Sequence, residues 1–362
     1  MPAFIRLASL AAAVIALSSC MYFGPDSVRS TRPEYNIAIQ QTNEQELLLN
    51  LVRLRYRDSL YFLSVEKVAS SVEFTRGIGA SAEIPERGWN KYTVGGAAVA
   101  MAEKPTIFYT PLEGERFSRQ MMSIVNPDIY VLLANSGWSI ERLMAVSLQE
   151  MNGLKNAPTA AGPTPSYEPV YQEFQQALRL LRTLQIRKEI EFGRVAFGND
   201  AHLELRFLPQ AANDPDAKEF KRLLGLKPEY SQFRVVLGLG QGEADTINVV
   251  PRSLIGVLNY LSQGVAPPER HLVAGKVTRT LTEAGESFDW QAVLGGLFSV
   301  NSATSKPDDA AVAVNYRDHW FYIRDNDLES KSTFSLLTQL FALQAGPQGG
   351  TATPITFSIG GR

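Results

Sequence analysis

Residues 167–191, YEPVYQEFQQALRLLRTLQIRKEIE, and residues 202–209, HLELRFLP, show two different periodicities close together in the chain. Apolar residues of the first stretch recur at spacings of four and three, at Val170, Phe174, Ala177, Leu181 and Leu184. This spacing predicts one long amphipathic helix with a basic solvated flank, packed on a core rather than on a partner. The second stretch alternates apolar and polar residues, which predicts a strand.

Helical and strand patterns continue to alternate on both sides of this stretch, but irregularly. Residues 46–58, ELLLNLVRLRYRD, predict a helix with a capping box formed by Thr42 and Gln45, and residues 60–109 predict a small, mainly antiparallel sheet. A last strand is expected near residues 355–359, ITFSI. The irregular order predicts an α+β fold with mixed or antiparallel sheets and packed helices, rather than a doubly wound parallel sheet.

One segment in the middle of the chain is a candidate linker. Residues 155–166, KNAPTAAGPTPS, contain three prolines and no large apolar side chain. Such a segment is typical of a domain boundary, although a surface loop has the same composition. We therefore expect two α+β domains, an N-terminal one over residues 34–154 and a C-terminal one over residues 167–362.

The composition excludes several classes of protein. Of 362 residues, 45% are hydrophobic and 20% are charged, which is too apolar for a disordered chain. Lys and Arg number 35 against 37 Asp and Glu, so no general basic surface for nucleic acid is expected. A single cysteine cannot form a disulfide within the chain.

The N-terminus, MPAFIRLASLAAAVIALSSC, has the layout of an export signal. Arg6 precedes an apolar run over residues 7–17, which is shorter than the roughly 20 residues of a membrane-spanning helix. Leu17-Ser18-Ser19-Cys20 then resembles the lipobox of bacterial lipoproteins: a branched apolar residue, two small residues and a cysteine. A plain signal peptide that leaves a free thiol is the alternative.

The resemblance to lipoproteins implies a set of processing steps. It implies that residues 1–19 are a signal peptide, cleaved between Ser19 and Cys20, and that the Cys20 thiol carries a diacylglycerol. Residues 20–33 would then be a tether between bilayer and fold. The residue after the cysteine is Met21 rather than Asp, which in this family implies sorting to the outer membrane, with the body on the periplasmic side.

The sequence shows no motif for a metal, a nucleotide or a serine nucleophile. His202, His271 and His319 are far apart and lack the spacing of a zinc site. The string Gly238-Leu239-Gly240-Gln241-Gly242 lacks the third Rossmann glycine and the Walker Lys-Ser/Thr, so a turn is expected there. Ser253 follows Pro251-Arg252 and is expected to begin a helix. We therefore expect no metal and no cofactor.

The acidic cluster Asp325-Asn326-Asp327-Leu328-Glu329 is the most suggestive polar group. It follows the aromatic strand Trp320-Phe321-Tyr322, so two or three carboxylates can converge at a strand end. Asp325, Asp327 and Glu329 are weak candidates for the acid and base of a glycoside hydrolase, or for a Ca²⁺ site. A tight turn followed by a helix N-terminus explains the same residues structurally, and we favour it.

The body is similar to a group of uncharacterised bacterial lipoproteins that share the patterns PTIFYTPLEGE, NSGW, RSLIGVLNYLS and FYIRDNDLESK. That resemblance carries over no activity or ligand. The resulting expectation is a lipoprotein held in the membrane through Cys20, binding protein partners as an accessory or scaffold subunit of an envelope secretion, export or assembly system. The alternatives are a tethered glycan hydrolase that uses the acidic cluster, and a carrier of a small ligand or lipid.

Overall fold

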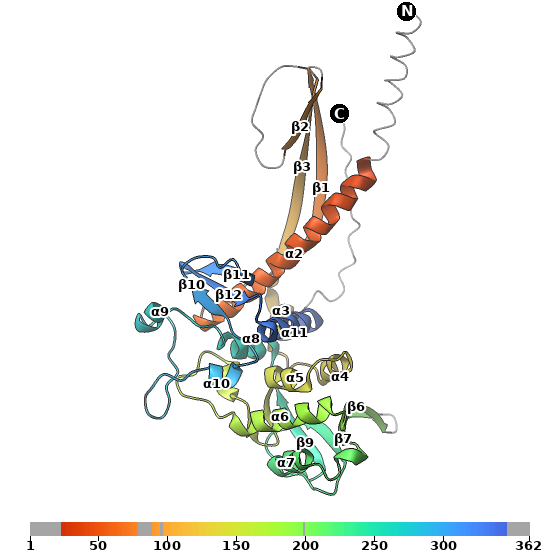
Figure 1. Ribbon diagram of the computed structural model, residues 1–362, viewed down its shortest axis with the longest axis vertical. Helices are drawn as coiled ribbons and strands as arrows, with labels where there is room; N and C mark the ends of the chain where they lie inside the picture. Colours follow the sequence, from red (N-terminus) through yellow and green to blue (C-terminus); the bar gives the residue numbers. More distant parts are fainter. Residues whose placement is uncertain (1–22, 79–88, 95–96, 198–199, 346–362) are drawn as a thin grey trace, which may run out of the picture. The chain divides into compact units, whose positions relative to one another are not determined.

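A computed structural model describes residues 23–78, 89–94, 97–197 and 200–345 (Figure 1). Within these residues the chain forms ten α-helices and three sheets, of which one is mixed and two are antiparallel. The predicted α+β class is therefore confirmed. The strand expected near residues 355–359 lies outside the described residues.

The chain divides into two compact units, Met1–Leu47 and Leu48–Arg362. Helix α2 (Phe23–Arg55) begins earlier than the capping box at Thr42 predicts, since residues 23–33 of the expected tether are already helical. The Thr42 hydroxyl donates to the carbonyl of Ala38 at 2.9 Å, as a residue inside a helix does. The apolar face expected near the end of this helix is present, because Leu48, Leu51 and Val52 are fully buried.

The predicted small sheet over residues 60–109 is present as three antiparallel strands. They are β1 (Leu63–Ile78), β2 (Trp89–Val94) and β3 (Ala97–Pro111), in the spatial order β1-β3-β2. Strand β1 pairs with β3 from Leu63↔Pro111 to Ile78↔Ala97, with one irregularity between Val65 and Lys67. The alternation of apolar and polar residues over residues 60–109 therefore correctly predicted antiparallel strands.

Three helices follow: α3 (Gly114–Met122), α4 (Pro127–Asn135) and α5 (Ile140–Ser147). Their starts are encoded locally. The side chain of Asn126 accepts a hydrogen bond from the Asp128 amide at the start of α4, and Ser139 accepts one from the Arg142 amide at the start of α5. Gly137, with a φ of +91°, provides the left-handed turn between them.

The segment expected as a linker, 155–166, is instead a packed part of the second unit. It follows the short strands β4 (Leu148–Met151) and β5 (Leu154–Lys155) and contains a 3-10 turn, η1 (Pro158–Ala161). Ala157 and Ala160 are fully buried, and the buried guanidinium of Arg55 donates to the Thr164 hydroxyl at 3.2 Å. Small side chains at these positions let the segment lie close to the core, which composition alone cannot distinguish from an exposed linker.

A six-stranded mixed sheet dominates the next part of the chain. Its order is β5-β4-β9-β8-β7-β6, with β6 (Ile190–Phe197), β7 (Asp200–Phe207), β8 (Gln232–Leu237) and β9 (Thr246–Pro251). Strands β8 and β9 are parallel and the other pairs are antiparallel. Helices α6 (Gln172–Ile186) and α7 (Pro215–Leu223) lie beside this sheet (Figure 1).

One face of this sheet is apolar and covered. Leu205, Phe207 and Phe233 are buried on it, and the Lys221 ammonium of α7 lies 4.9 Å from the centroid of the Phe207 ring. The opposite face includes Glu204, which pairs with Arg234 across β7 and β8. A sheet with one packed and one polar face is the usual antiparallel arrangement.

The remaining helices are α8 (Leu254–Ser262), α9 (Glu269–Val273), α10 (Gln291–Leu294) and α11 (Leu328–Ala345). Ser253 begins α8 as expected, because its hydroxyl accepts a hydrogen bond from the Gly256 amide. The third sheet has the order β10-β12-β11, with β10 (Asn301–Ala303), β11 (Ala310–Tyr316) and β12 (His319–Arg324). Arg317 and Asp318 both have positive φ in the two-residue turn between β11 and β12.

Candidate functional site

The residues proposed for lipid attachment, Leu17-Ser18-Ser19-Cys20, lie outside the described residues. In the part of the chain that is described, no helix combines the length and the apolar character needed to cross a bilayer. The anchoring prediction therefore rests on the sequence.

The three acidic candidates occupy the turn before α11 and its first residues, and each has a structural partner. Asp327 caps the helix, since it accepts hydrogen bonds from the amide and the hydroxyl of Ser330 at 3.0 and 2.6 Å. The Asp325 carboxylate pairs with the Lys331 ammonium at 2.6 Å, and the Glu329 carboxylate pairs with Arg142 of α5. Of the three carboxylates, Asp327 thus acts as a helix cap, and Asp325 and Glu329 form ion pairs.

Two of the three histidines lie together. His271 of α9 and His319 of β12 are almost fully buried, and their ring centroids are 4.9 Å apart. Nδ1 of His271 lies 2.7 Å from the Tyr56 hydroxyl, and Nδ1 of His319 lies 2.8 Å from Nη2 of Arg270. The same Nδ1 of His319 lies 3.3 Å from the Arg317 carbonyl, so two polar groups face this ring nitrogen. Among the described residues no group of three or more metal-ligating side chains is present.

Burial lowers the pKa of the His271 imidazole, and the nearby charges of Lys276, His319, Arg270 and Arg317 lower it further. In the unfolded chain His271 titrates near the ordinary value of about 6.5. The unfolded state therefore binds more protons in acid, so stability is complete above about pH 6.5 and is lost as the pH falls toward the folded pKa.

We expect the melting temperature of the protein to fall by at most about 2 °C between about pH 7.5 and pH 5.5 because of this buried histidine, since one titrating group contributes at most about 1.4 kcal/mol over this range. His271→Gln keeps an acceptor for the Tyr56 hydroxyl but does not titrate, so its melting temperature should depend less on pH. His202→Gln, at a partly exposed position of β7, is the matched control and should keep the wild-type dependence. Equal pH dependence in His271→Gln and the wild type would contradict this assignment.

The glycine string lies in the loop that connects the parallel strands β8 and β9. Gly240 has a φ of +70°. Its amide donates to the Glu150 carboxylate at 3.0 Å, and the Gly242 amide donates to the Asn152 side chain at 3.3 Å. These amides, which would cradle a phosphate in a nucleotide-binding loop, bind side chains of the chain's own β4–β5 region.

The most distinctive candidate site lies along strand β6, which the sequence pattern does not predict. The helix predicted over residues 167–191 is shorter: α6 ends at Ile186, and Ile190 already begins β6. Lys188 has a φ of +56°, a left-handed conformation that cannot continue a right-handed helix. Glycine usually occupies such a position, so the residue type gives no sign that the helix ends here. The apolar–polar alternation of residues 190–192 was the available signal, but Gly193 interrupts it.

Strand β6 is an edge of the six-stranded sheet, since it pairs only with β7 among the described strands. The Leu208 amide donates to the Glu189 carbonyl at 2.8 Å, so these two residues form a hydrogen-bonded pair. Hydrogen-bonded pairs alternate along an antiparallel ladder. The amide and carbonyl groups of Ile190 and Phe192 therefore point away from β7, and no described residue forms a hydrogen bond with them.

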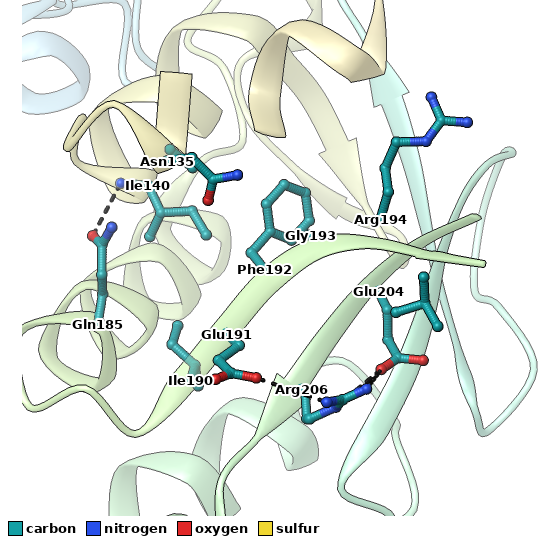
Figure 2. Close-up of a pocket in the computed structure, with 12 residues that line it drawn as sticks. Asn135, Ile140, Gln185, Ile190, Glu191, Phe192, Gly193, Arg194, Glu204 and Arg206 are labelled. Atoms are coloured by element: carbon teal, nitrogen blue, oxygen red, sulfur yellow. Dashed lines mark hydrogen bonds and ion pairs between the residues drawn. The ribbon is translucent and has the colours of Figure 1, made fainter. Parts of the chain in front are cut away.

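A pocket of about 580 Å³ lies along this edge. Its lining includes Ile190 and Phe192 of β6, Ala134 at the end of α4, Ile140 at the start of α5 and Gln185 of α6. Figure 2 shows Phe192 on the side of Ile140 and Asn135. The apolar side of the pocket thus lies directly beside the unpaired main-chain groups.

The polar side of the pocket carries charges that are already paired. Arg206 contacts Glu204 at 2.9 Å and Glu191 at 3.8 Å, and Figure 2 shows Glu191 turned toward Arg206. On the opposite side of β6, which Phe192 shares, Arg194 forms an ion pair with Asp128 at the start of α4. The Arg194–Asp128 and Arg206–Glu191 pairs are about half-exposed and contribute little stability, so they can rearrange when a polar chain approaches, whereas Glu204 is buried.

An open strand edge beside a pocket is the geometry used for strand addition. An extended peptide that lies along β6 would bond to the outward amides and carbonyls of Ile190 and Phe192, and every second side chain would face the apolar side of the pocket. The opposite edge of the sheet is formed by β5, which has only two residues and is too short to pair with an extended peptide. The described part of the sheet therefore offers β6 as its extended free edge.

In comparisons with known proteins, no family model, no curated protein and no solved structure matches this chain.

Proposed function

We propose that the chain is a lipid-anchored protein of the bacterial envelope, held at the outer membrane through Cys20, that binds a partner protein as an accessory or scaffold subunit. The observation that carries the binding role is the open β6 edge beside its pocket. The lipobox-like Leu17-Ser18-Ser19-Cys20 supports the anchor. An anchored body with a free strand edge is suited to capturing an extended segment of another envelope protein.

No observation in the structure specifically supports the glycan hydrolase or the ligand carrier. Asp325, Asp327 and Glu329, the acid and base of the hydrolase alternative, are engaged by Lys331, Ser330 and Arg142.

A carrier of lipid or of a small apolar ligand needs an apolar cavity, but four charged residues, Glu191, Arg194, Glu204 and Arg206, line the pocket along β6. A charged lining and unpaired main-chain groups favour a polypeptide over an acyl chain.

The binding role is tested by Phe192→Asp in the full chain. A carboxylate at this position opposes burial of a partner side chain beside Ile140, so the yield of cross-linked partner should fall about tenfold. The measurement is chemical cross-linking of envelope membranes, purification in mild detergent and identification of the same partner by mass spectrometry.

Gly193→Ala is the matched control. The added methyl group meets no atom within 4 Å, and it points to the polar face of the strand, away from Phe192. This variant should keep the yield within about twofold. Recovery of the same partner with Phe192→Asp at the wild-type yield, or of a wild-type monomer with no reproducible partner, would contradict the proposal. Equal melting temperatures of the two variants would show that binding, rather than folding, was measured.

A further inference from the structure

A second pocket, of about 410 Å³, is lined by residues of α5, α6, α10 and the start of α11. It is distinct from the pocket along β6, because the two pockets share no lining residue. Four charged side chains line it: Glu141 and Arg142 of α5, Arg179 of α6 and Glu329 of α11. Its volume is within the range of ligand pockets, about 300–1,000 Å³.

The guanidinium of Arg142 is held in place by contacts that do not involve a carboxylate. The Arg142 side chain is only 13% exposed. Its Nη1 donates to the Thr333 hydroxyl at 2.6 Å and to the main-chain carbonyl of Glu329 at 2.7 Å. Only Nη2 contacts the Glu329 carboxylate. The cation therefore stays in place when that carboxylate moves away.

The Glu329 carboxylate, in contrast, can turn into solvent. The Glu329 side chain is 60% exposed and lies in the first turn of α11. When another carboxylate takes its place on Arg142, the buried cation is not left unpaired, so the exchange avoids the main cost of breaking such a pair. A guanidinium also matches a carboxylate in shape, because two parallel N–H···O hydrogen bonds can form. The position that Glu329 occupies therefore fits the carboxylate of a bound molecule.

The two other charged side chains of the pocket are unpaired. Neither Arg179 nor Glu141 forms an ion pair or a side-chain hydrogen bond with a described residue. With Glu329 turned into solvent, two cations and one carboxylate line the pocket, so one positive charge is left unbalanced. A carboxylate supplies one negative charge, whereas a phosphate group carries about −1.5 to −2 and is repelled more strongly by Glu141. The pocket therefore favours a carboxylate over a phosphate.

The pocket also contains groups that match a polypeptide main chain and an apolar side chain. Leu178 and Val293 are buried in its wall. Gly296 lies in the turn after α10 with a φ of +75°, and its amide forms no hydrogen bond with a described residue. This amide is a free donor, and the Glu141 carboxylate is a free acceptor. A fatty acid has no N–H group that could use this acceptor.

We propose that this pocket binds the C-terminal residue of a polypeptide. Its α-carboxylate replaces that of Glu329 on Arg142. Its amide N–H donates to Glu141, and its apolar side chain packs against Leu178. Arg179 supplies the second positive charge. Capture of a C-terminal carboxylate is an established mode of peptide recognition, and here it goes beyond the proposed function, because it uses none of the groups on the β6 edge.

The site is tested with the peptide N-acetyl-Gly-Gly-Leu, titrated into the full chain in mild detergent and followed by calorimetry. The same peptide with a C-terminal amide is the matched control, since it lacks only the carboxylate. We expect the free acid to bind at least about tenfold more tightly than the amide, because only the acid can replace Glu329 on Arg142.

Two variants test the roles of the charged side chains. Glu329→Gln removes the competing charge and should tighten binding of the free acid about threefold, whereas Arg179→Met removes an attractive charge and should weaken it about threefold. Glu283→Gln, outside the pocket, is the matched control and should bind as the wild type does. All three side chains are exposed, so folding should be unaffected.

Equal binding of the acid and the amide, no measurable binding at about 10 mM peptide, or an unchanged affinity of Glu329→Gln would overturn the proposal. Pentanoate that binds as tightly as the peptide would show that the pocket takes a small acid rather than a polypeptide, and would also overturn it. The cross-linking test with Phe192→Asp does not involve this pocket, so the failure of either proposal is distinguishable from failure of the other.

Discussion

Replacement of Arg252 by methionine should lower the free energy of unfolding by about 4 kcal/mol, since it removes several buried charge-assisted hydrogen bonds at once. Arg252 directly precedes Ser253, the N-cap of α8, and only 1% of its surface is exposed. Its Nη1 donates to the carbonyls of Ala145 and Val146, each at 3.2 Å. These carbonyls belong to the last turns of α5.

The remaining contacts join further parts of the fold. Nη1 also donates to the Leu148 carbonyl, Nη2 donates to the Asn156 carbonyl, and the guanidinium lies 3.9 Å from the centroid of the Tyr260 ring. Burial lowers the pKa of Arg252 to about 10, so the side chain stays charged at neutral pH. A cation at the end of α5 also stabilises the negative end of the helix dipole.

Methionine fills part of the same volume but leaves these buried carbonyls without a donor. Arg234→Met is the matched control, because the Arg234 side chain is 52% exposed and lies 3.6 Å from Asp245. That surface pair should contribute less than about 1 kcal/mol. Urea unfolding of the two variants measures the difference; similar losses of stability would show that Arg252 does not have the central role assigned to it.

The α+β class could be predicted from the sequence because its signals are local. The spacing of Leu48, Leu51 and Val52 marks the buried face of α2, and Ser139 marks the start of α5. Alternation over residues 60–109 marks the sheet of β1, β2 and β3. Each of these features depends on neighbours within a few residues.

The candidate site could not be predicted, because it depends on contacts between distant residues. Ile190 fits the end of the α6 pattern as well as the start of β6, and only the positive φ of Lys188 separates the two. The edge position of β6 depends on the order of all six strands, including the parallel β8–β9 pair. Similarly, composition suggests that Arg252 is exposed, and only the fold shows that it is buried.

Replacement of Cys20 by alanine should move the protein from the membrane fraction to the soluble fraction almost completely. Each methylene buried in the bilayer contributes roughly 0.8 kcal/mol, so the two or three acyl chains that the lipobox resemblance implies hold a protein stably, whereas one chain is marginal. The chain contains no second cysteine that could be acylated in its place. Loss of this one thiol should therefore abolish the anchor.

Ser19→Ala is the matched control for this variant. It replaces one small residue by another directly before the cysteine and should leave the membrane fraction unchanged. Release of both variants to the same extent would show that disturbed export, rather than loss of the lipid, explains the result.

Metabolic labelling with radioactive palmitate tests most directly whether the chain is a lipid-anchored envelope protein. The wild-type protein and Ser19→Ala should be labelled, and Cys20→Ala should not. Label that persists in Cys20→Ala, or a membrane-bound wild-type protein without label, would contradict lipid anchoring through Cys20.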